Sequence, residues 1–422
     1  MEPNGRGRKP RVLLIGPFYS PACYGGAVQV YHQMFSRLQR LDATVVSQWL
    51  GCDREAAREF DAGCERLYGY RMCRIPRYEL IFPSGASAPR KLHDAWRFFR
   101  DTPGHLRAVI ERERPDAIIC GATIIAGWLM SRLPRHIPRI NYLHGEELGR
   151  LSTSRFVWRY LFRTQLQAIR EADLNISVSR YTAQRAGELT GVDAGSFAVL
   201  PNFVDLDRYR PPSDRAAVRR RLGWEGRKVI LSLARLIRRK GFDQGIRAVA
   251  RLRSEGRLGP EWVHVIAGKG EQEPHLKRLA AELGVEDHTE FAGFVPDAEM
   301  ADYYGAADLF LHPNRNLDGD TEGFGIVFLE ASACGVPVIG GEAGGTADAI
   351  REGVSGYRID AENLEAIGDA IHRLTGDEEL RTRMSRTGIE LVQREYSAGE
   401  AVKRFEDLVF NQLDAFQAKR HA

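Results

Sequence analysis

Short apolar runs alternate along this chain with longer stretches that have helical periodicity. In the first half, five runs predict buried strands: "VLLIG" (12–16), "DATVVS" (42–47), "DAIIC" (116–120), "RINYLH" (139–144) and "LNISVS" (174–179). Amphipathic stretches such as "VYHQMFSRL" and "RFVWRYLFRTQLQAIREA" lie between them and predict helices. Alternation of strand and helix indicates a parallel sheet with helices on both faces.

The alternation stops at "VLPNFVDLDRYRPPSD" (199–214), whose proline and aspartate content predicts a linker, and then restarts. Later strands are predicted at "KVILSLARL", "WVHVIAGKG", "TEFAGF", "DLFLHP" and "VPVIGG", with helices such as "EPHLKRLAAEL" and "EMADYYGAA" between them. We therefore predict two Rossmann-like α/β domains, residues 1–203 and 204–390, with a hinge near 202–210. A length of 422 residues, too long for one ordinary core, agrees with two domains.

The tail 391–422 predicts one amphipathic helix that crosses back to the first domain. Its apolar positions fall on one face: Val402, Phe405, Leu408, Val409 and Leu413.

Composition narrows the class of protein. A hydrophobic content of 43% and a charged content of 27% are typical of a globular protein, and no stretch approaches 18 consecutive apolar residues. The six cysteines show no C-x-x-C spacing, so neither a zinc site nor a disulfide framework is indicated. We expect a cytoplasmic protein.

The two halves of the chain carry opposite net charge. Up to Arg210 there are 31 Lys and Arg residues against 21 Asp and Glu, a net charge of +10, and the remainder has 29 against 35, a net charge of −6. A basic first domain is expected to face an anionic partner. The alternative is that its arginines are exposed to solvent on helix faces, which would give the same net charge.

Two cations follow the first strand of the second domain. Arg235 comes just past the strand end in "VILSLARLIRRKGFDQGI", and Lys240 follows five residues later, before a helix. A guanidinium fork and a mobile ammonium suit a pyrophosphate. The alternative is a loop of surface cations that also includes Arg238 and Arg239.

Glycine turns and one histidine also follow predicted strands. "GGA" (25–27) puts Gly25 and Gly26 after the first strand, where they either bring backbone near a ligand or only turn the chain. Gly268 belongs to "IAGKGEQE", an incomplete dinucleotide fingerprint because Glu273 occupies the third glycine position. His144 lies at a strand end, where it is either a structural residue or part of a ligand-binding site.

The stretch "TEGFGIVFLE" (321–330) places Glu322 and Glu330 on either side of a Gly-Phe-Gly turn that enters an apolar helix. An acidic first turn is favoured by the helix dipole alone. Alternatively, backbone N–H groups at the helix start bind an anion while the carboxylates hold hydroxyls.

These pieces, in this order, resemble the retaining glycosyltransferases of the GT-B fold, family 4. The likeness covers nearly the whole chain and includes "GGA", "HG", "SVSRYTA", "LPNFVDLDRY", "ARLIRRKG", "IAGKGEQEPHLKRLA" and "EGFGIVFLEASACGVPVIGGEAGGTADAI". The E-x7-E from Glu322 to Glu330 is its most specific element. The family often has G-G-x-P-E where this chain has "GGTAD", although Gly344 and Gly345 are kept. The resemblance implies two Rossmann-like domains facing across a cleft.

The resemblance also implies roles for the charged residues. Arg235 and Lys240 would hold the donor diphosphate and stabilise the leaving group. Glu322 would accept hydrogen bonds from the donor sugar and Glu330 from the ribose. On this interpretation no cofactor and no metal ion is required, and nucleic acid is not a partner.

Other site residues are implied through their backbone or their position. Backbone groups of Phe324, Gly325 and Ile326 would cap the sugar and phosphate. From the first domain, Gly25 and Gly26 would approach the donor and His144 would orient the sugar. Gly268 and Val295 are also expected at the donor.

The donor is first predicted to be GDP-mannose, with UDP-glucose or UDP-N-acetylglucosamine as the alternative. Asp297, two residues after Val295, would accept hydrogen bonds from N1–H and N2–H of guanine, whereas uracil offers one donor only. The alternative for Asp297 is a helix N-cap.

The acceptor is expected to be a glycan, a glycolipid or a small molecule, and a phosphoinositide-type lipid is among the candidates. Arginines recur every four residues beside aromatic residues on one predicted helix: Arg155, Arg159, Arg163, Phe156, Trp158 and Phe162. This pattern predicts peripheral contact with the anionic inner face of the plasma membrane, unless the aromatic side chains are buried in the domain.

Four other classes of protein are alternatives to a glycosyltransferase. A nicotinamide oxidoreductase needs a complete glycine fingerprint after the first strand, and "GPFYSPACYGG" lacks one. A phosphorylase usually has a much longer chain and a pyridoxal lysine, and an epimerase is an alternative on the same fold. An inactive sugar-nucleotide-binding protein should have lost Arg235, Lys240 or Glu322, and all three are present.

Overall fold

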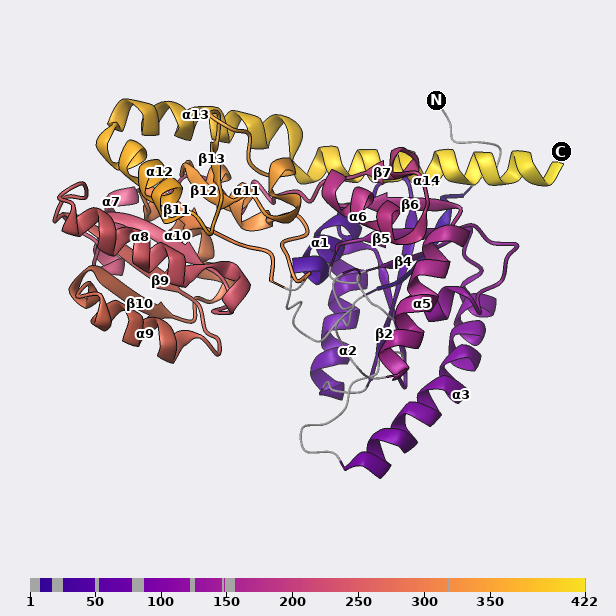
Figure 1. The fold of residues 1–422 in the computed structure, drawn as a ribbon. Helices are drawn as coiled ribbons and strands as arrows, with labels where there is room; N and C mark the ends of the chain where they lie inside the picture. The colour runs from indigo at the N-terminus through magenta and orange to yellow at the C-terminus, as the bar shows by residue number, and fades with distance from the viewer. Residues whose placement is uncertain are drawn as a thin grey trace. The chain divides into compact units, whose positions relative to one another are not determined.

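The computed structural model describes residues 8–16, 26–49, 53–77, 87–121, 126–145, 148, 156–317 and 319–421. It divides the chain into two compact units, Met1–Leu200 with Gly399–Ala422, and Pro201–Ala398. Each unit has one parallel sheet with helices on its faces (Figure 1). The predicted fold class, α/β with two Rossmann-like domains, is confirmed.

The first unit is built on a seven-stranded sheet in the order β3-β2-β1-β4-β5-β6-β7. Every neighbouring pair is parallel. Its elements are β1 (Arg11–Ile15), α1 (Gly26–Phe35), β2 (Asp42–Gln48), α2 (Arg54–Gly63), β3 (Arg71–Ile75), α3 (Ala88–Glu113), β4 (Ala117–Gly121), α4 (Ala126–Met130), β5 (Arg139–Leu143), α5 (Phe156–Glu171), β6 (Leu174–Ser177), α6 (Arg180–Thr190) and β7 (Ala198–Val199).

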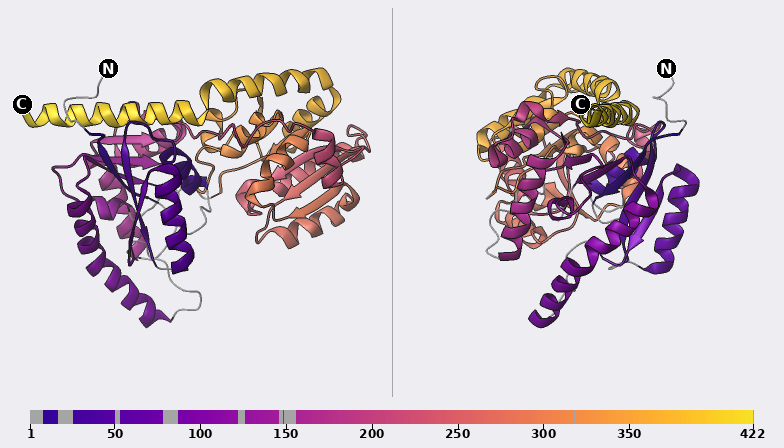
Figure 2. Two further views of the ribbon diagram at one scale, coloured as in Figure 1. Left: turned by 180° about the vertical axis from the view of Figure 1, so that it is seen from behind. Right: turned by 90° about the vertical axis from the view of Figure 1, so that its right-hand side faces the viewer.

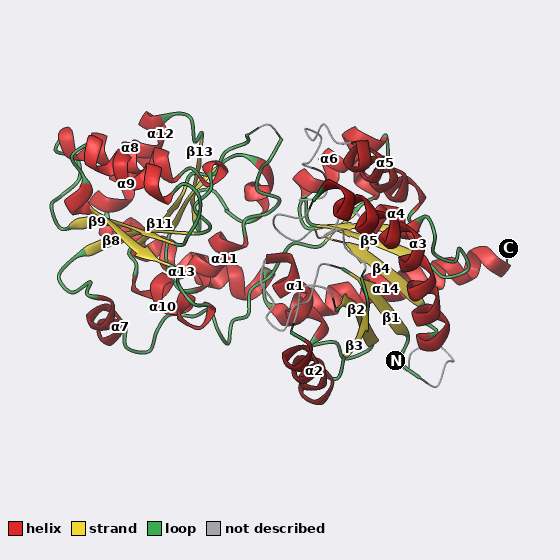
Figure 3. Cartoon of the chain, turned by 90° about the horizontal axis from the view of Figure 1, so that it is seen from below, coloured by secondary structure: helices red, strands yellow, loops and turns green. Residues whose placement is uncertain are grey.

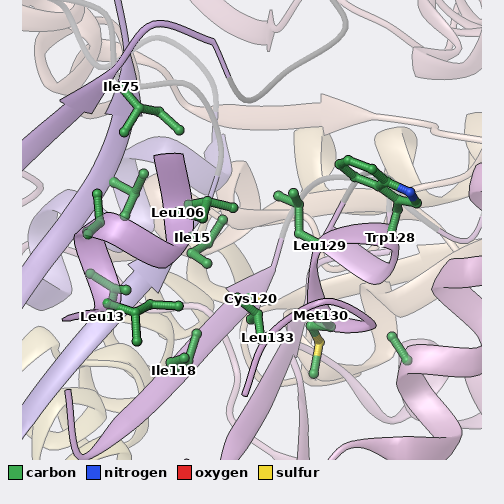
Figure 4. Packing of buried hydrophobic residues seen from close by; sticks show 14 of the residues in the cluster. Leu13, Ile15, Ile75, Leu106, Ile118, Cys120, Trp128, Leu129, Met130 and Leu133 are labelled. Atoms are coloured by element: carbon green, nitrogen blue, oxygen red, sulfur yellow. The ribbon is translucent and has the colours of Figure 1, made fainter. Parts of the chain in front are cut away.

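The core of the first unit lies on both faces of this sheet, as its continuous apolar strands predict. One face packs against α3, α4 and α5, and Figure 4 shows residues from β1, β3 and β4 meeting those of α3 and α4. On the other face, Phe35 of α1 contacts Phe405 of α14 (Ala398–His421), with 6.0 Å between the ring centroids.

The final helix α14 runs along the first unit (Figure 2). Buried Glu406 anchors it, because one carboxylate oxygen accepts the backbone N–H groups of Gln39 and Arg40 at 2.8 and 2.6 Å. Among the described residues, no helix combines the length and the hydropathy that crossing a bilayer requires.

Helix α5 carries the basic and aromatic pattern singled out above. Phe162 is buried in the core of the first unit, while Arg159 and Arg163 are exposed. Arg155 and the side chains of Phe156 and Trp158 lie outside the described part of the chain. For Phe162, burial in the domain is therefore the correct interpretation.

The second unit has a six-stranded parallel sheet in the order β10-β9-β8-β11-β12-β13. Helices lie on both faces of this sheet (Figure 3). Its strands are β8 (Lys228–Leu233), β9 (Trp262–Ala267), β10 (Thr289–Gly293), β11 (Leu309–His312), β12 (Val338–Gly341) and β13 (Gly356–Ile359). Its helices are α7 (Arg215–Leu222), α8 (Phe242–Ser254), α9 (Glu273–Glu282), α10 (Met300–Ala306), α11 (Ile326–Ala333), α12 (Leu364–Gly376) and α13 (Glu378–Glu395).

The strand order reverses direction between β8 and β11, which are neighbours. A crevice opens at such a switch point outside the carboxyl ends of the two strands, and ligands of open α/β sheets bind there. The loops that follow β8 and β11 contain Arg235, Lys240 and Glu322. These three residues are therefore expected to lie at the ligand-binding end of the sheet.

Candidate functional site

Lys240 and Glu322 meet at the switch point of the second unit. The Lys240 ammonium donates to Oε2 of Glu322 at 2.5 Å, and the Arg239 guanidinium donates to the same oxygen at 2.9 Å. Arg239 also pairs with Asp320 at 3.1 Å. The Glu322 carboxylate thus pairs with two cations that lie 82 and 83 positions earlier in the chain.

The ionisation of this group follows from its burial and its charges. Burial alone would raise the pKa of Glu322, but Lys240 and Arg239 outweigh it and hold that pKa well below its ordinary value. Burial lowers the pKa of Lys240, and Arg239 and Arg235 act in the same direction against the attraction of Glu322. We infer that Glu322 is ionised at neutral pH.

A buried histidine lies close enough to Lys240 and Glu322 for their charges to affect its pKa. His312 ends β11 and is fully buried, with its ring 6.1 Å from Phe310 and 5.7 Å from Phe328. Burial and the nearby Lys240 lower its pKa well below the ordinary value. Neither ring nitrogen has a hydrogen-bond partner among the described residues.

Helix α11 begins beside Glu322 without a side-chain cap. Its N-cap is Gly325, at φ 91° and ψ 57°, a left-handed conformation that glycine adopts without strain. Phe324 is buried directly before it, and Ile326 is the first helical residue. Gly344, at φ +77°, packs so closely that an added Cβ would lie 2.1 Å from the carbonyl oxygen of Glu322.

This arrangement suits an anionic ligand with hydroxyl groups. An uncapped helix start offers backbone N–H groups and a positive dipole end to an anion. The cations of the preceding loop add charge, and Glu322 supplies acceptor oxygens for hydroxyls. Arg235 is exposed just past β8 and adds a further cation at the same end of the sheet.

Glu330 occupies a separate buried position on α11. Its Oε2 accepts the hydroxyl of Tyr304 on α10 at 2.9 Å, and the Tyr209 hydroxyl bonds the same carboxylate. Burial raises the pKa of Glu330, while the two tyrosine hydroxyls act in the opposite direction. Two neutral donors therefore fix the orientation of this carboxylate.

Asp297 is connected to Glu330 through the segment 208–209. The Arg208 guanidinium donates to the backbone carbonyl of Asp297 and lies 3.9 Å from its carboxylate. The same guanidinium stacks 4.9 Å above the ring of Tyr209, which reaches Glu330. Val295, just before this turn, is buried.

The N-cap interpretation of Asp297 is wrong. Asp297 is itself the first residue of a short 3-10 helix, whose cap is Pro296, and the following α10 is capped by Glu299. Neither start has a side-chain cap hydrogen bond. The Asp297 carboxylate is about half exposed, at 53%.

Gly268 shapes the edge of the site rather than completing a dinucleotide fingerprint. At φ +133° it packs against the loop after β8, and an added Cβ would lie 1.9 Å from the carbonyl oxygen of Ala234. A side chain here would therefore displace the loop that carries Arg235.

Two candidate residues belong to the first unit. Gly26 is the first residue of α1, and Gly25 lies outside the described part of the chain. His144 follows β5 and is buried beside Tyr31 and Tyr142, with ring centroids 5.0 and 4.8 Å away. Burial lowers the pKa of His144 to about 3, so the imidazole is neutral.

Five residues of the second unit were not predicted as site residues: Arg208, Tyr209, Arg239, Tyr304 and His312. Arg239 and Arg238 look alike in sequence, yet Arg239 is 11% exposed and paired whereas Arg238 is exposed. Tyr209 lies in "RYR" and Tyr304 in "DYYGAA". Both sequence patterns are too common to identify these tyrosines as site residues.

No group of three or more His, Cys, Asp or Glu residues with the arrangement of a metal site occurs within the described ranges.

Comparison with known proteins gives two family models and many relatives. A model described as glycosyl transferases group 1 matches residues 214–391, and a model described as glycosyltransferase family 4 matches residues 24–208. A GDP-mannose-dependent alpha-(1-6)-phosphatidylinositol monomannoside mannosyltransferase of Mycolicibacterium smegmatis is 36% identical over 363 residues, which cover 83% of this chain and 86% of that protein. The protein of the same name in Mycobacterium tuberculosis is 32% identical, with 92% and 94% covered.

Solved structures share the fold at low sequence identity. HepE from Anabaena, in complex with UDP and glucose, aligns with a TM-score of 0.73 at 20% identity, over 95% of this chain and 99% of that chain. Sucrose-phosphate synthase from Thermosynechococcus elongatus aligns with a TM-score of 0.71 at 17% identity, over 97% and 100%.

Proposed function

The chain belongs to glycosyltransferase family 4, and from this premise we propose that it transfers mannose from GDP-mannose to a phosphatidylinositol-linked mannoside. The family resemblance predicted from the motifs is confirmed, as are the GT-B fold and the assignment to hexosyltransferases. The observation that carries the choice of donor and acceptor is the similarity, over more than four fifths of both chains, to enzymes named for that donor and that acceptor.

In this proposal the reaction breaks the bond between the anomeric carbon and the donor phosphate oxygen. A new bond forms between that carbon and an acceptor hydroxyl oxygen, with retention of configuration, and the hydroxyl proton leaves with the diphosphate. Arg235 and Lys240 stabilise the charge that develops on GDP, and backbone N–H groups at the start of α11 assist them. These cations supply the charge that a divalent metal ion supplies in other transferases.

The remaining candidates would position the donor. Glu322 accepts hydroxyls of the sugar, and Glu330 accepts hydroxyls of the ribose. From the first unit, Gly26 gives the donor close approach to backbone and His144 orients the sugar as a neutral imidazole. Asp297 accepts the two N–H groups of guanine.

Nucleotide binding is expected to depend on Glu330. Glu330→Gln keeps an oxygen for the buried tyrosine hydroxyls but removes the charge, so it should weaken GDP binding about 10-fold with little change in the kcat at saturating donor. Isothermal titration with GDP measures the first effect and steady-state kinetics the second. Equal GDP affinity in both proteins would contradict the ribose role.

A thermal-shift panel of GDP, UDP and ADP tests the donor. At 100 times its Kd, the cognate nucleotide should add about 2.7 kcal/mol to the free energy of unfolding. We expect stabilisation by GDP and not by UDP. Asp297→Ala should reduce the GDP effect, and Asp287→Ala, a control at another exposed acidic residue, should not. Stabilisation by UDP alone would end the mannose proposal and favour UDP-glucose or UDP-N-acetylglucosamine.

A further inference from the structure

Arg239 joins the two loops that form the charged end of the second sheet. It belongs to a short 3-10 helix, Arg238–Lys240, that follows β8, and its guanidinium is largely buried. One guanidinium nitrogen donates to Oε2 of Glu322 at 2.9 Å, and Nε lies 3.1 Å from the Asp320 carboxylate. Both carboxylates belong to the loop that follows β11, so Arg239 connects that loop to the end of β8.

The backbone around Arg239 is held by contacts that do not involve Glu322. The carbonyl oxygen of Arg239 accepts the N–H of Arg315 at 2.9 Å, and the Arg315 guanidinium donates to both carboxylate oxygens of Asp243 at 2.9 Å. Two residues after Arg239, Gly241 has φ +72°, and an added Cβ there would lie 1.9 Å from the carbonyl oxygen of Pro313. The fold therefore fixes the position from which Arg239 reaches Glu322.

Glu322 shares one carboxylate oxygen between two cations whose roles differ. The Lys240 ammonium lies 2.5 Å from that oxygen. In the proposed reaction the same ammonium binds the diphosphate, whose negative charge attracts it away from the carboxylate. A buried carboxylate that loses its counter-charge is strongly destabilised. Arg239 supplies a second counter-charge, and its other partner, Asp320, keeps it on the side of the β11 loop.

We propose that Arg239 is a positioning residue for the carboxylate that binds the sugar: when the diphosphate engages Lys240, Arg239 keeps Glu322 ionised and directed at the sugar hydroxyls. This role rests on the proposed function, in which Glu322 accepts those hydroxyls and Lys240 acts on the leaving group. Arg239 touches neither the sugar nor the diphosphate in this arrangement, and it acts only through Glu322.

The charges that act on Glu322 make this division of roles specific. Lys240, Arg239 and His312 all lower the pKa of Glu322, and burial opposes them. His312 has a pKa well below its ordinary value, so its imidazole is neutral at neutral pH and adds no counter-charge. Of these three groups, Arg239 is therefore the cation that remains with Glu322 once Lys240 is engaged.

The pH dependence of turnover tests this role. Arg239→Gln removes the charge, so the pKa of Glu322 in the donor complex should rise. The ionised carboxylate is lost as the pH falls through that pKa, and the acidic limb of the kcat profile should therefore move to higher pH by about one unit or more. The limb of kcat/KM should move less, because it reports the free enzyme, in which Lys240 still pairs with Glu322.

Nucleotide binding provides a readout that does not depend on turnover. Arg239→Gln should weaken the binding of GDP-mannose about 10-fold, because the sugar is held through Glu322. It should affect the binding of GDP no more than Arg238→Gln, which removes the same charge from the neighbouring exposed residue. Arg239→Lys restores a cation and should recover part of the affinity for GDP-mannose. Isothermal titration measures each affinity, and retained GDP binding shows that a variant is folded.

Two results would overturn the role of Arg239: equal losses of affinity for GDP and GDP-mannose in Arg239→Gln, or an acidic limb of kcat that stays in place. A failure of the proposed donor is distinguishable from both. If the unaltered protein binds UDP and UDP-glucose but not GDP, the proposed donor is wrong, and the comparison of UDP with UDP-glucose in Arg239→Gln then decides the role of Arg239.

Discussion

Lys240→Ala should lower kcat by about 100-fold or more, because it removes a cation that acts on the developing charge of the leaving diphosphate. Lys240 is 8% exposed and already directed at the ligand end of the sheet by Glu322. Arg235→Ala should have an effect of the same order. Steady-state kinetics at saturating donor measures both.

The neighbouring loop residue supplies the control. Arg238 is exposed and has no ion-pair partner among the described residues, so Arg238→Ala should retain the kcat of the unaltered enzyme. If Lys240→Ala and Arg238→Ala behaved alike, the assignment of Lys240 to the diphosphate would fail.

Glu322→Ala should abolish most turnover and also destabilise the protein. Removal of the carboxylate leaves Lys240 and Arg239 close together without their counter-charge, and breaking a buried ion pair costs about 3–5 kcal/mol. The loss of hydrogen bonds to the sugar lowers kcat in addition. Urea unfolding measures the first effect and donor-saturated kinetics the second.

A double variant separates stability from chemistry. Lys240→Met with Glu322→Gln removes both charges of the pair, so it should recover part of the stability lost in Glu322→Ala while remaining inactive. Full turnover of Glu322→Ala with GDP-mannose and with each UDP-sugar would show that the paired glutamates have another role.

The fold could be predicted because the sequence alternates strongly between apolar strands and amphipathic helices. Every strand inferred from an apolar run is a strand of the structure, with ends shifted by a few residues. The strands β3, β7 and β13 were not predicted. β7 has two residues, and "RMCRI" of β3 and "GYRI" of β13 carry arginines at exposed edges of their sheets, which hides the apolar pattern.

The candidate site could be predicted only as a set of residue types at strand ends. The Glu322 to Glu330 spacing and the cations after β8 are visible in the sequence. The pairing of Arg239 with Glu322 is not visible in the sequence, because it joins two loops that are 83 positions apart. The neighbouring Arg238 is the same residue type, so the sequence does not show which of the two arginines forms the pair. Tyr209 and Tyr304 likewise meet Glu330 only after the chain folds.

The most direct test of the account is a transfer assay with the purified chain. The protein is incubated with GDP-mannose and phosphatidylinositol monomannoside, and the lipid product is analysed by mass spectrometry. The account predicts a product whose mass is higher by one hexose, formed from GDP-mannose and absent with UDP-glucose. A product formed from UDP-glucose but not from GDP-mannose would contradict it.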